Sequence, residues 1–277
     1  MSPSGDADLL ARARCALLDA LDALKDHRES VVVIGAQAIY LHTGSVEVAL
    51  AEATKDSDLA LDARSLGSDP LIEDAMRAAN FVPNPISGQP GSWVNPQGIP
   101  VDLMVPEAIA GGTGSRAAHQ PPHDKHAMRR AVGLEAAVVD NAEMEIRALS
   151  EADPRAVRAR VAGPAALLVA KLHKLGERQE TPTRLIDKDA HDVYRLLVAI
   201  PTQKLGTDLR ALSNDALAGD VTVKALQYLR HMFAAGPTAT GSAMAGRAEQ
   251  GVGEPEIVAS SCAVLATELI DAISGSK

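Results

Sequence analysis

The stretch from residue 31 to residue 62 constrains the fold of this chain more than any other part of the sequence. The four β-branched residues Val31–Ile34 stop at Gly35 and Ala36, and a short helical segment and a loop then lead to Thr54–Leu61. A buried strand that ends at a glycine lets the next helix present free backbone N–H groups, which can hold a phosphate. The pattern predicts strand, glycine turn, helix, loop and strand.

Two carboxylates occupy alternate positions of the second predicted strand. Asp56 and Asp58 are two residues apart, so they are expected on one face of the sheet. Anionic oxygens this close repel each other unless a hard divalent cation such as Mg²⁺ lies between them. A third carboxylate, Asp102, interrupts the apolar strand predicted over 99–105. Because an unpaired buried charge is costly, we expect Asp102 either to join a metal site or to pair with a nearby Arg or Lys.

The loop predicted over 110–126 and the residues after it bring basic and histidine side chains near the acidic strands. The histidines are compatible with a zinc site, but the Pro121–Pro122 pair breaks helical spacing and no fourth ligand is evident, which favours a plain loop. The residues concerned are Arg116, Lys125, Arg129 and Arg130, and His119, His123 and His126.

From Pro164 onward the pattern is helical. Lys171, Lys174 and Arg178 share one helical face, which is basic. A second helix carries Asp187, Asp189 and Asp192 in its first turns, where carboxylates also complement the helix dipole. Lys171 has a second interpretation too, since a lysine stem can lie along an apolar surface. The Gly- and Ala-rich segment 234–253 predicts an exposed, flexible linker between later helices.

Composition narrows the function classes. The formal net charge of −9 argues against a general polyanion-binding surface, and 2% aromatic residues argue against a base-stacking platform for single-stranded nucleic acid. The two cysteines, Cys15 and Cys262, predict neither a disulfide framework nor a cysteine-rich zinc site. With no basic N-terminal signal and no uninterrupted apolar run of membrane-spanning length, the sequence predicts a cytoplasmic protein with no membrane partner.

Together these features suit two-metal handling of a nucleoside triphosphate. Asp56, Asp58 and Asp102 are the candidate ligands of two Mg²⁺ ions, which activate the attacking oxygen and stabilise the pyrophosphate leaving group. The glycine turn at Gly35 and Ala36 is the candidate phosphate site. The basic side chains of Lys171, Lys174 and Arg178 are candidates for neutralising the triphosphate.

The order of these motifs resembles the nucleotidyltransferase superfamily. The segment Ala170–Arg178 (AKLHKLGER), followed by Asp187–Tyr194 (DKDAHDVY), is similar to the AbiEii/MenT-type nucleotidyltransferase toxins, and the resemblance spans roughly residues 30–200. It implies an α+β fold in which a mixed-sheet catalytic domain precedes a helical C-terminal domain. We place these domains at residues 1–155 and 156–277.

The resemblance also implies the remaining functional assignments. The protein would transfer a nucleotide from an NTP to an acceptor in a Mg²⁺-dependent reaction, and in relatives the acceptor can be a tRNA 3′ end. Lys171 and Asp189 would complete the active site. Thr54 corresponds to the position at which an antitoxin phosphorylates some relatives, so a cognate antitoxin is an implied partner.

Two other functions remain open at this point. The acidity and the scarcity of aromatic residues also suit a nucleotidyltransferase that modifies a small molecule, as antibiotic-modifying enzymes do. A binding or regulatory module with a degenerate active site is the non-enzymatic alternative. Its main support is Ala36, which stands where many superfamily members carry a serine that bonds the terminal phosphate.

Overall fold

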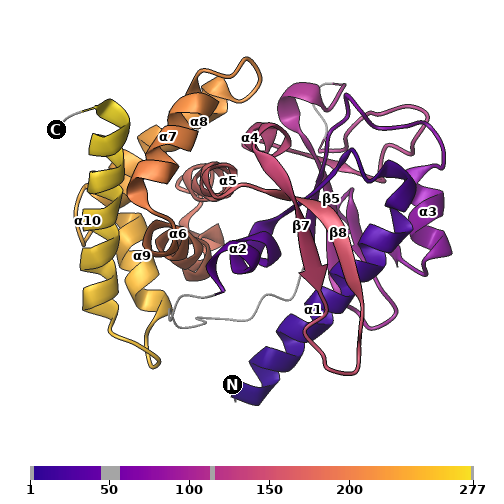
Figure 1. Ribbon diagram of the computed structural model, residues 1–277, viewed down its shortest axis with the longest axis horizontal. Coiled ribbons are helices and arrows are strands. Elements are labelled where there is room, and N and C mark those ends of the chain that lie inside the picture. The colour runs from indigo at the N-terminus through magenta and orange to yellow at the C-terminus, as the bar shows by residue number, and fades with distance from the viewer. Residues whose placement is uncertain (1–2, 45–56, 113–115, 276–277) are drawn as a thin grey trace. The chain divides into compact units, whose positions relative to one another are not determined.

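The computed structural model describes residues 3–44, 57–112 and 116–275, and these residues form an α+β protein with a mixed sheet. The chain divides into two units (Figure 1). The sheet unit comprises residues 1–38 and 53–162, and the helical unit comprises residues 39–52 and 163–277. The predicted boundary at 155/156 differs from this division, because the last strand of the sheet lies beyond it.

The sheet unit combines short strands with a few helices. Its elements in chain order are α1 (Pro3–Ala23), a 3₁₀ turn (Lys25–His27), β1 (Val31–Ile34), α2 (Gly35–Thr43, of which residues from Ile39 belong to the helical unit), β2 (Ser57–Leu61), α3 (Ile72–Ala78), β3 (Val82–Pro83), β4 (Ser92–Val94), β5 (Pro100–Pro106), a 3₁₀ turn (Glu107–Ile109), β6 (Arg129–Ala131), α4 (Glu135–Val139), β7 (Asn141–Arg147) and β8 (Ala156–Ala162).

The strands of the described residues form one eight-stranded sheet in the order β3-β4-β5-β2-β1-β8-β7, with β6 paired to β5. β2 pairs with β1 in antiparallel fashion and with β5 in parallel fashion, while β1 and β8 are parallel. All four residues of β1 are buried, as expected for a central strand with both faces covered. The sequence prediction of strands at 31–34 and 99–105 is confirmed within one residue.

Helix α1 packs across one face of this sheet. It contacts β2, β5 and β8, and the hydroxyl of Ser57 donates a 2.9 Å hydrogen bond to the carbonyl of Ala13. Leu17, Leu59 and Leu103 are fully buried in the sheet unit. Burial of such leucines contributes about 1.5–3 kcal/mol each to folding. The face of β2 that carries Ser57 and Leu59 is therefore the face that packs against α1.

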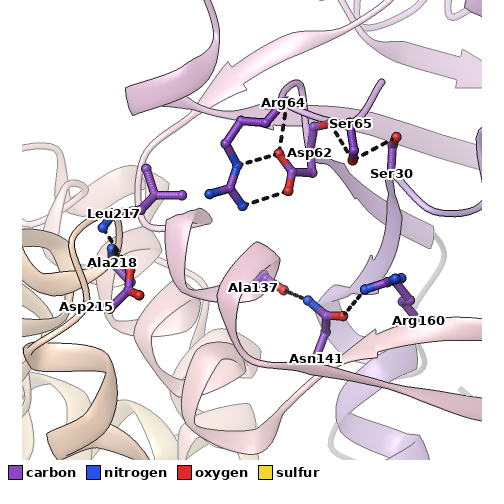
Figure 2. A network of polar contacts seen from close by, with 10 residues as sticks. All are labelled: Ser30, Asp62, Arg64, Ser65, Ala137, Asn141, Arg160, Asp215, Leu217 and Ala218. Atoms are coloured by element: carbon purple, nitrogen blue, oxygen red, sulfur yellow. Dashed lines mark hydrogen bonds and ion pairs between the residues drawn. The ribbon is translucent and has the colours of Figure 1, made fainter. Parts of the chain in front are cut away.

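Polar contacts secure the strand ends farthest from Asp58 (Figure 2). Arg64 forms a forked ion pair with Asp62, with distances of 2.8 Å and 2.7 Å, and the Asp62 N–H donates to the carbonyl of Ser30. Burial alone would raise the pKa of Asp62, but the donors of Arg64 lower it below its usual value. The C-terminal end of β2 is therefore held by the ion pair of Asp62 with Arg64 and by the backbone hydrogen bond to Ser30.

The helical unit contains the C-terminal half of α2 and the helices that follow Gly163. Its elements are α5 (Pro164–Gly176), a 3₁₀ turn (Pro182–Arg184), α6 (Asp187–Ala199), α7 (Thr202–Ser213), α8 (Gly219–Leu229), a π-helical turn (Arg230–Ala234), α9 (Thr240–Ala248) and α10 (Pro255–Ser274). Pro164 occupies the first turn of α5, where its missing N–H costs no hydrogen bond.

The prediction of a flexible linker over 234–253 is wrong, because this segment contains helix α9. Gly241, Met244 and Gly246 are buried, and α9 packs on α6 and α10. A Cβ on Gly241 would lie 2.5 Å from the Phe233 ring, so the small residues serve close packing rather than flexibility.

Helix α10 is the one described helix that is long and apolar enough to compare with a membrane span. Its mean hydropathy is 1.6 and a third of that window is buried within the protein. The helix contacts α9 and α7 and carries Glu268 and Asp271 on its exposed side. Length and composition are the two properties that α10 shares with a membrane-spanning helix.

Candidate functional site

Asp58 and Asp102 lie side by side on the sheet face opposite α1. β2 and β5 are parallel neighbours, and their register pairs Asp58 directly with Asp102. Ser57, one residue earlier, faces α1, so alternation along the strand turns Asp58 to the other face. Two carboxylates that are far apart in sequence are thereby brought together. This juxtaposition is the one that the sequence analysis required for a metal site.

The glycine turn contacts the same acidic pair. Gly35 follows β1, whose last residue Ile34 pairs with Asp58, and it has a φ of +67°. A Cβ at Gly35 would overlap Asp58 Oδ2, so the backbone of the turn runs directly against this carboxylate. Only glycine satisfies both the left-handed conformation and the close approach. The N-terminus of α2 therefore begins beside Asp58.

Two buried side chains hold the first turn of α2 in place. Arg14 of α1 donates from Nε to Gln37 Oε1 at 2.8 Å and from Nη1 to the carbonyl of Arg147 at 2.9 Å. Burial lowers the pKa of Arg14. Arg14 carries no sequence signal for this role, because it lies within a segment that shows only an amphipathic helical pattern.

Asp102 forms an ion pair with Arg129, the alternative that the sequence analysis left open. Arg129 Nη2 lies 2.7 Å from Asp102 Oδ2, and both side chains are about four-fifths buried, at 23% and 20% exposed. Nε of Arg129 is buried and has no hydrogen-bond partner among the described residues. A guanidinium held this way neutralises one carboxylate and also offers donors for an anionic oxygen.

The carboxylates fit a hard divalent cation by their chemistry. Asp58 and Asp102 supply oxygen ligands on one face, which is the donor type that Mg²⁺ prefers. Asp56, the third predicted ligand, lies outside the described residues, as does Thr54. Within the described ranges no three His, Cys, Asp or Glu side chains are grouped to hold a metal ion. A full ligand set would therefore need Asp56 or water.

A second polar cluster lies entirely within the helical unit, between α5 and α6. Lys171 Nζ lies 2.8 Å from Asp189 Oδ1 and 2.6 Å from Asp192 Oδ2, and all three side chains are buried. Lys171 donates a hydrogen bond to Asp189 and forms an ion pair with Asp192. Lys174 and Arg178 also reach Asp189, at 2.9 Å and 3.5 Å.

Mutual attraction keeps this cluster ionised despite its burial. Burial alone would lower the pKa of Lys171, but the carboxylates of Asp189 and Asp192 raise it above its usual value. Burial would likewise raise the pKa of Asp189, but Lys171 and Lys174 hold it well below its usual range. Asp189 is therefore the centre of a charged network rather than a solvated residue of a first helical turn.

The cluster confirms that Lys171, Lys174 and Arg178 share one face, because all three contact the same carboxylate. Lys171 pairs with Asp189 and Asp192, so its side chain does not simply extend along an apolar surface toward solvent. The contacts within the helical unit account for the ionisation of these residues, and their catalytic and cofactor-binding roles stay predictions.

Two histidines of the 110–126 loop have identified partners in the structure. His123 is buried, with Nδ1 accepting from the N–H of Ile72 at 3.2 Å and Nε2 lying 2.9 Å from the carbonyl of Gly67. The two ring nitrogens thus anchor the loop to the start of α3 and to the segment that precedes this helix. His126 lies near Asp124 at 3.5 Å and is largely exposed.

Comparisons of the chain with family models, with curated proteins and with solved structures find no match. The functional argument therefore depends on the residues themselves.

Proposed function

We propose that the chain is a Mg²⁺-dependent nucleotidyltransferase that moves a nucleotide from an NTP to an acceptor and releases pyrophosphate. The observation that carries this proposal is the in-register placement of Asp58 and Asp102, with the Gly35 turn against Asp58. A carboxylate pair beside a helix N-terminus combines ligands for a cation with backbone donors for a phosphate. We also propose that the mixed sheet is that of a nucleotidyltransferase fold.

Each part of the site has a distinct task in this mechanism. Asp58 and Asp102, with Asp56 as the predicted third ligand, would hold Mg²⁺, which when bound neutralises the triphosphate and activates the attacking oxygen. The free N–H groups at the start of α2 bind phosphate oxygens. Arg129 orients the Asp102 carboxylate through its 2.7 Å ion pair and donates to an anionic oxygen of the substrate.

The acceptor in this proposal is an RNA hydroxyl, a tRNA 3′ end by the resemblance described above. The hydroxyl gives up its proton to water and its oxygen bonds to the α-phosphorus. The bond from that phosphorus to the bridging oxygen breaks, and pyrophosphate leaves with the bridging oxygen. On the basis of the same resemblance, we propose that the protein is a cytoplasmic toxin with a cognate antitoxin. Thr54 is then the residue that the antitoxin phosphorylates. Lys171 and Asp189 are the proposed contributions from the helical unit.

The test is transfer of label from α-³²P-labelled NTPs to total tRNA in the presence of MgCl₂. Asp58→Asn and Asp102→Asn should each reduce transfer by at least about 100-fold, since each removes a charged metal ligand. Asp62→Asn is the matched control, because Asp62 lies at the other end of β2 and pairs with Arg64. Full transfer by both site variants would refute the proposal.

A small-molecule acceptor is the second candidate. The net charge of −9 and the 2% aromatic content favour an acceptor other than RNA. A panel of aminoglycosides and other hydroxylated small molecules, incubated with the same labelled NTPs, separates the two acceptors. Transfer to a panel member but not to tRNA would replace the first candidate.

A regulatory module without turnover is the non-enzymatic candidate. Ala36 at the turn and the pairing of Asp102 with Arg129 favour it, because the first lacks a phosphate-binding hydroxyl and the second occupies a metal ligand. Saturable NTP binding by calorimetry, with no labelled product from any acceptor, would support this candidate.

A further inference from the structure

Arg129 lies on the same face of the sheet as the acidic pair. Strand β6 pairs with β5 in parallel, and the register sets Arg129 beside Met104, two residues after Asp102. Because side chains alternate along β5 and paired residues of neighbouring strands point the same way, Asp102, Met104 and Arg129 share one face. From there Arg129 reaches Asp102, with Nη2 2.7 Å from Oδ2. The guanidinium therefore borders the candidate metal site directly.

The ion pair works against a divalent cation at Asp102. Its two side chains are 23% and 20% exposed, so the charges are partly shielded from water. Even with the dielectric constant of water, about 80, the repulsion between a unit charge and a divalent ion about 5 Å apart corresponds to roughly a tenfold loss of affinity. The guanidinium also occupies one oxygen of the carboxylate. We therefore expect free Mg²⁺ to bind the acidic pair weakly while Arg129 holds Asp102.

A triphosphate removes this obstacle. A guanidinium presents five N–H donors in a planar fork and binds phosphate oxygens as it binds carboxylates. An anionic phosphate beside Arg129 would offset its positive charge and compete with Asp102 for its donors. The carboxylate of Asp102 would then be available to a cation.

Arg130 shows that this placement is specific to one of two adjacent arginines. It pairs with Val105, the next position of β5, so its side chain starts from the opposite face. Its guanidinium donates to the carbonyl of Gly112 at 2.9 Å and lies 3.4 Å from Glu107. The two arginines carry the same charge but contact different carboxylates.

We propose that Arg129 makes metal binding at this site depend on the nucleotide. It pairs with Asp102 in the metal-free protein and donates to the triphosphate when an NTP arrives together with its Mg²⁺. This inference rests on the proposed nucleotidyltransferase function and deepens it. Arg129 is the residue by which the site accepts metal–nucleotide complexes and discriminates against free metal ions.

The test measures binding rather than turnover. Mn²⁺ stands in for Mg²⁺, because both prefer oxygen ligands, and electron paramagnetic resonance at low salt measures the Mn²⁺ that stays free. Arg129→Gln should tighten the binding of Mn²⁺ without nucleotide by at least about tenfold, since the repelling charge is gone. The same variant should weaken the binding of ATP in EDTA, measured by calorimetry, by at least about tenfold, since the charged donor is gone. A loss of structure would weaken both, so opposite changes separate the proposed role from a merely structural one.

Two variants serve as controls. Arg130→Gln makes the same charge change one residue later and should leave both affinities close to those of the wild type, because Arg130 pairs with Glu107. Arg129→Lys keeps the charge at the site and should leave Mn²⁺ binding close to that of the wild type. This variant keeps the proposal falsifiable if Arg129→Gln does not fold, because tighter Mn²⁺ binding by Arg129→Lys would contradict it.

A second substitution locates the metal. Asp58→Asn, added to Arg129→Gln, should abolish the tight binding of Mn²⁺. Equal Mn²⁺ affinity of the wild type and Arg129→Gln, weakened in both by Asp58→Asn, would overturn the inference and leave the proposed metal site in place. Mn²⁺ binding that Asp58→Asn does not change in either background would overturn both, because the metal would then lie elsewhere.

Discussion

At the scale of single residues, Gly35 joins the backbone of the turn to the chemistry of the site. Its φ of +67° is in the left-handed region, and its Cα abuts the Asp58 carboxylate. Gly88 has a similar φ of +59°, but a Cβ on this residue would meet no atom within 4 Å. A side chain at Gly88 would therefore meet only backbone strain, whereas a side chain at Gly35 would meet backbone strain and steric overlap with Asp58.

We expect Gly35→Ala to lower the free energy of unfolding of the sheet unit by about 2–4 kcal/mol, because strain and steric overlap add. Gly88→Ala should cost only about 1–2 kcal/mol, since strain acts alone. Urea unfolding followed by Trp93 fluorescence measures both, because this tryptophan lies in the sheet unit. Equal losses for the two variants would mean that the Asp58 carboxylate moves aside at no cost.

At the scale of elements, α5 and α6 are joined by charges rather than by apolar contacts alone. Lys171 of α5 lies between Asp189 and Asp192 of α6 in a buried position, whereas Lys174 is 42% exposed at the edge of the same cluster. A buried ion pair is costly to break, because the remaining charge loses its partner. Exposed pairs contribute little.

Lys171→Met should therefore destabilise the helical unit by about 3–5 kcal/mol. Lys174→Met, the matched control from the same helix, should cost at most about 1 kcal/mol. The measurement is urea unfolding followed by circular dichroism at 222 nm. Adding Asp192→Asn to Lys171→Met should recover part of the loss, since it removes the carboxylate left without its lysine. A double variant no more stable than Lys171→Met would contradict this account.

The sequence predicts individual elements better than it predicts their partners. The strand at 31–34, the turn at Gly35 and the helix start at Pro164 are encoded locally, by β-branched residues, glycine and proline. Alternation within one strand predicts which face Asp58 occupies, but the register that sets it beside Asp102 depends on the parallel pairing of β2 with β5. Such long-range pairing leaves no local signal.

The failures have the same physical origin. Glycine and alanine suggest a linker over 234–253, yet in α9 they permit close approach to Phe233 and Pro255, a tertiary effect. The charged segment around Pro154 suggests a domain boundary, whereas β8 runs to Ala162, pairs with both β7 and β1, and stays with the sheet unit. The sequence places Arg129 near the acidic site only as general positive charge, and its bond to Asp102 depends on the tertiary fold.

At the scale of the whole molecule, the two units depend on pH for different reasons. In the sheet unit, the pairs of Asp62 with Arg64 and of Asp153 with Arg155 are partly exposed, so solvent screening limits their contribution. In the helical unit, Asp189 is buried and its cations hold its pKa well below the usual 3.8. Protonation of this one carboxylate would leave the buried Lys171 with Asp192 as its one charged partner in the cluster.

Acid should therefore unfold the helical unit before the sheet unit. A carboxylate whose pKa is depressed by folding contributes stability that is fully present above its usual pKa of 3.8, and that is lost as the pH falls toward the lower folded pKa. The circular dichroism signal at 222 nm, which comes largely from α5 to α10, should decline below about pH 4, while Trp93 fluorescence changes only at lower pH. Asp189→Asn removes the titrating group, so this variant should be less stable at pH 7 but show a flatter decline in acid. Coincident transitions by both probes, unchanged in Asp189→Asn, would show that the buried cluster does not control acid stability.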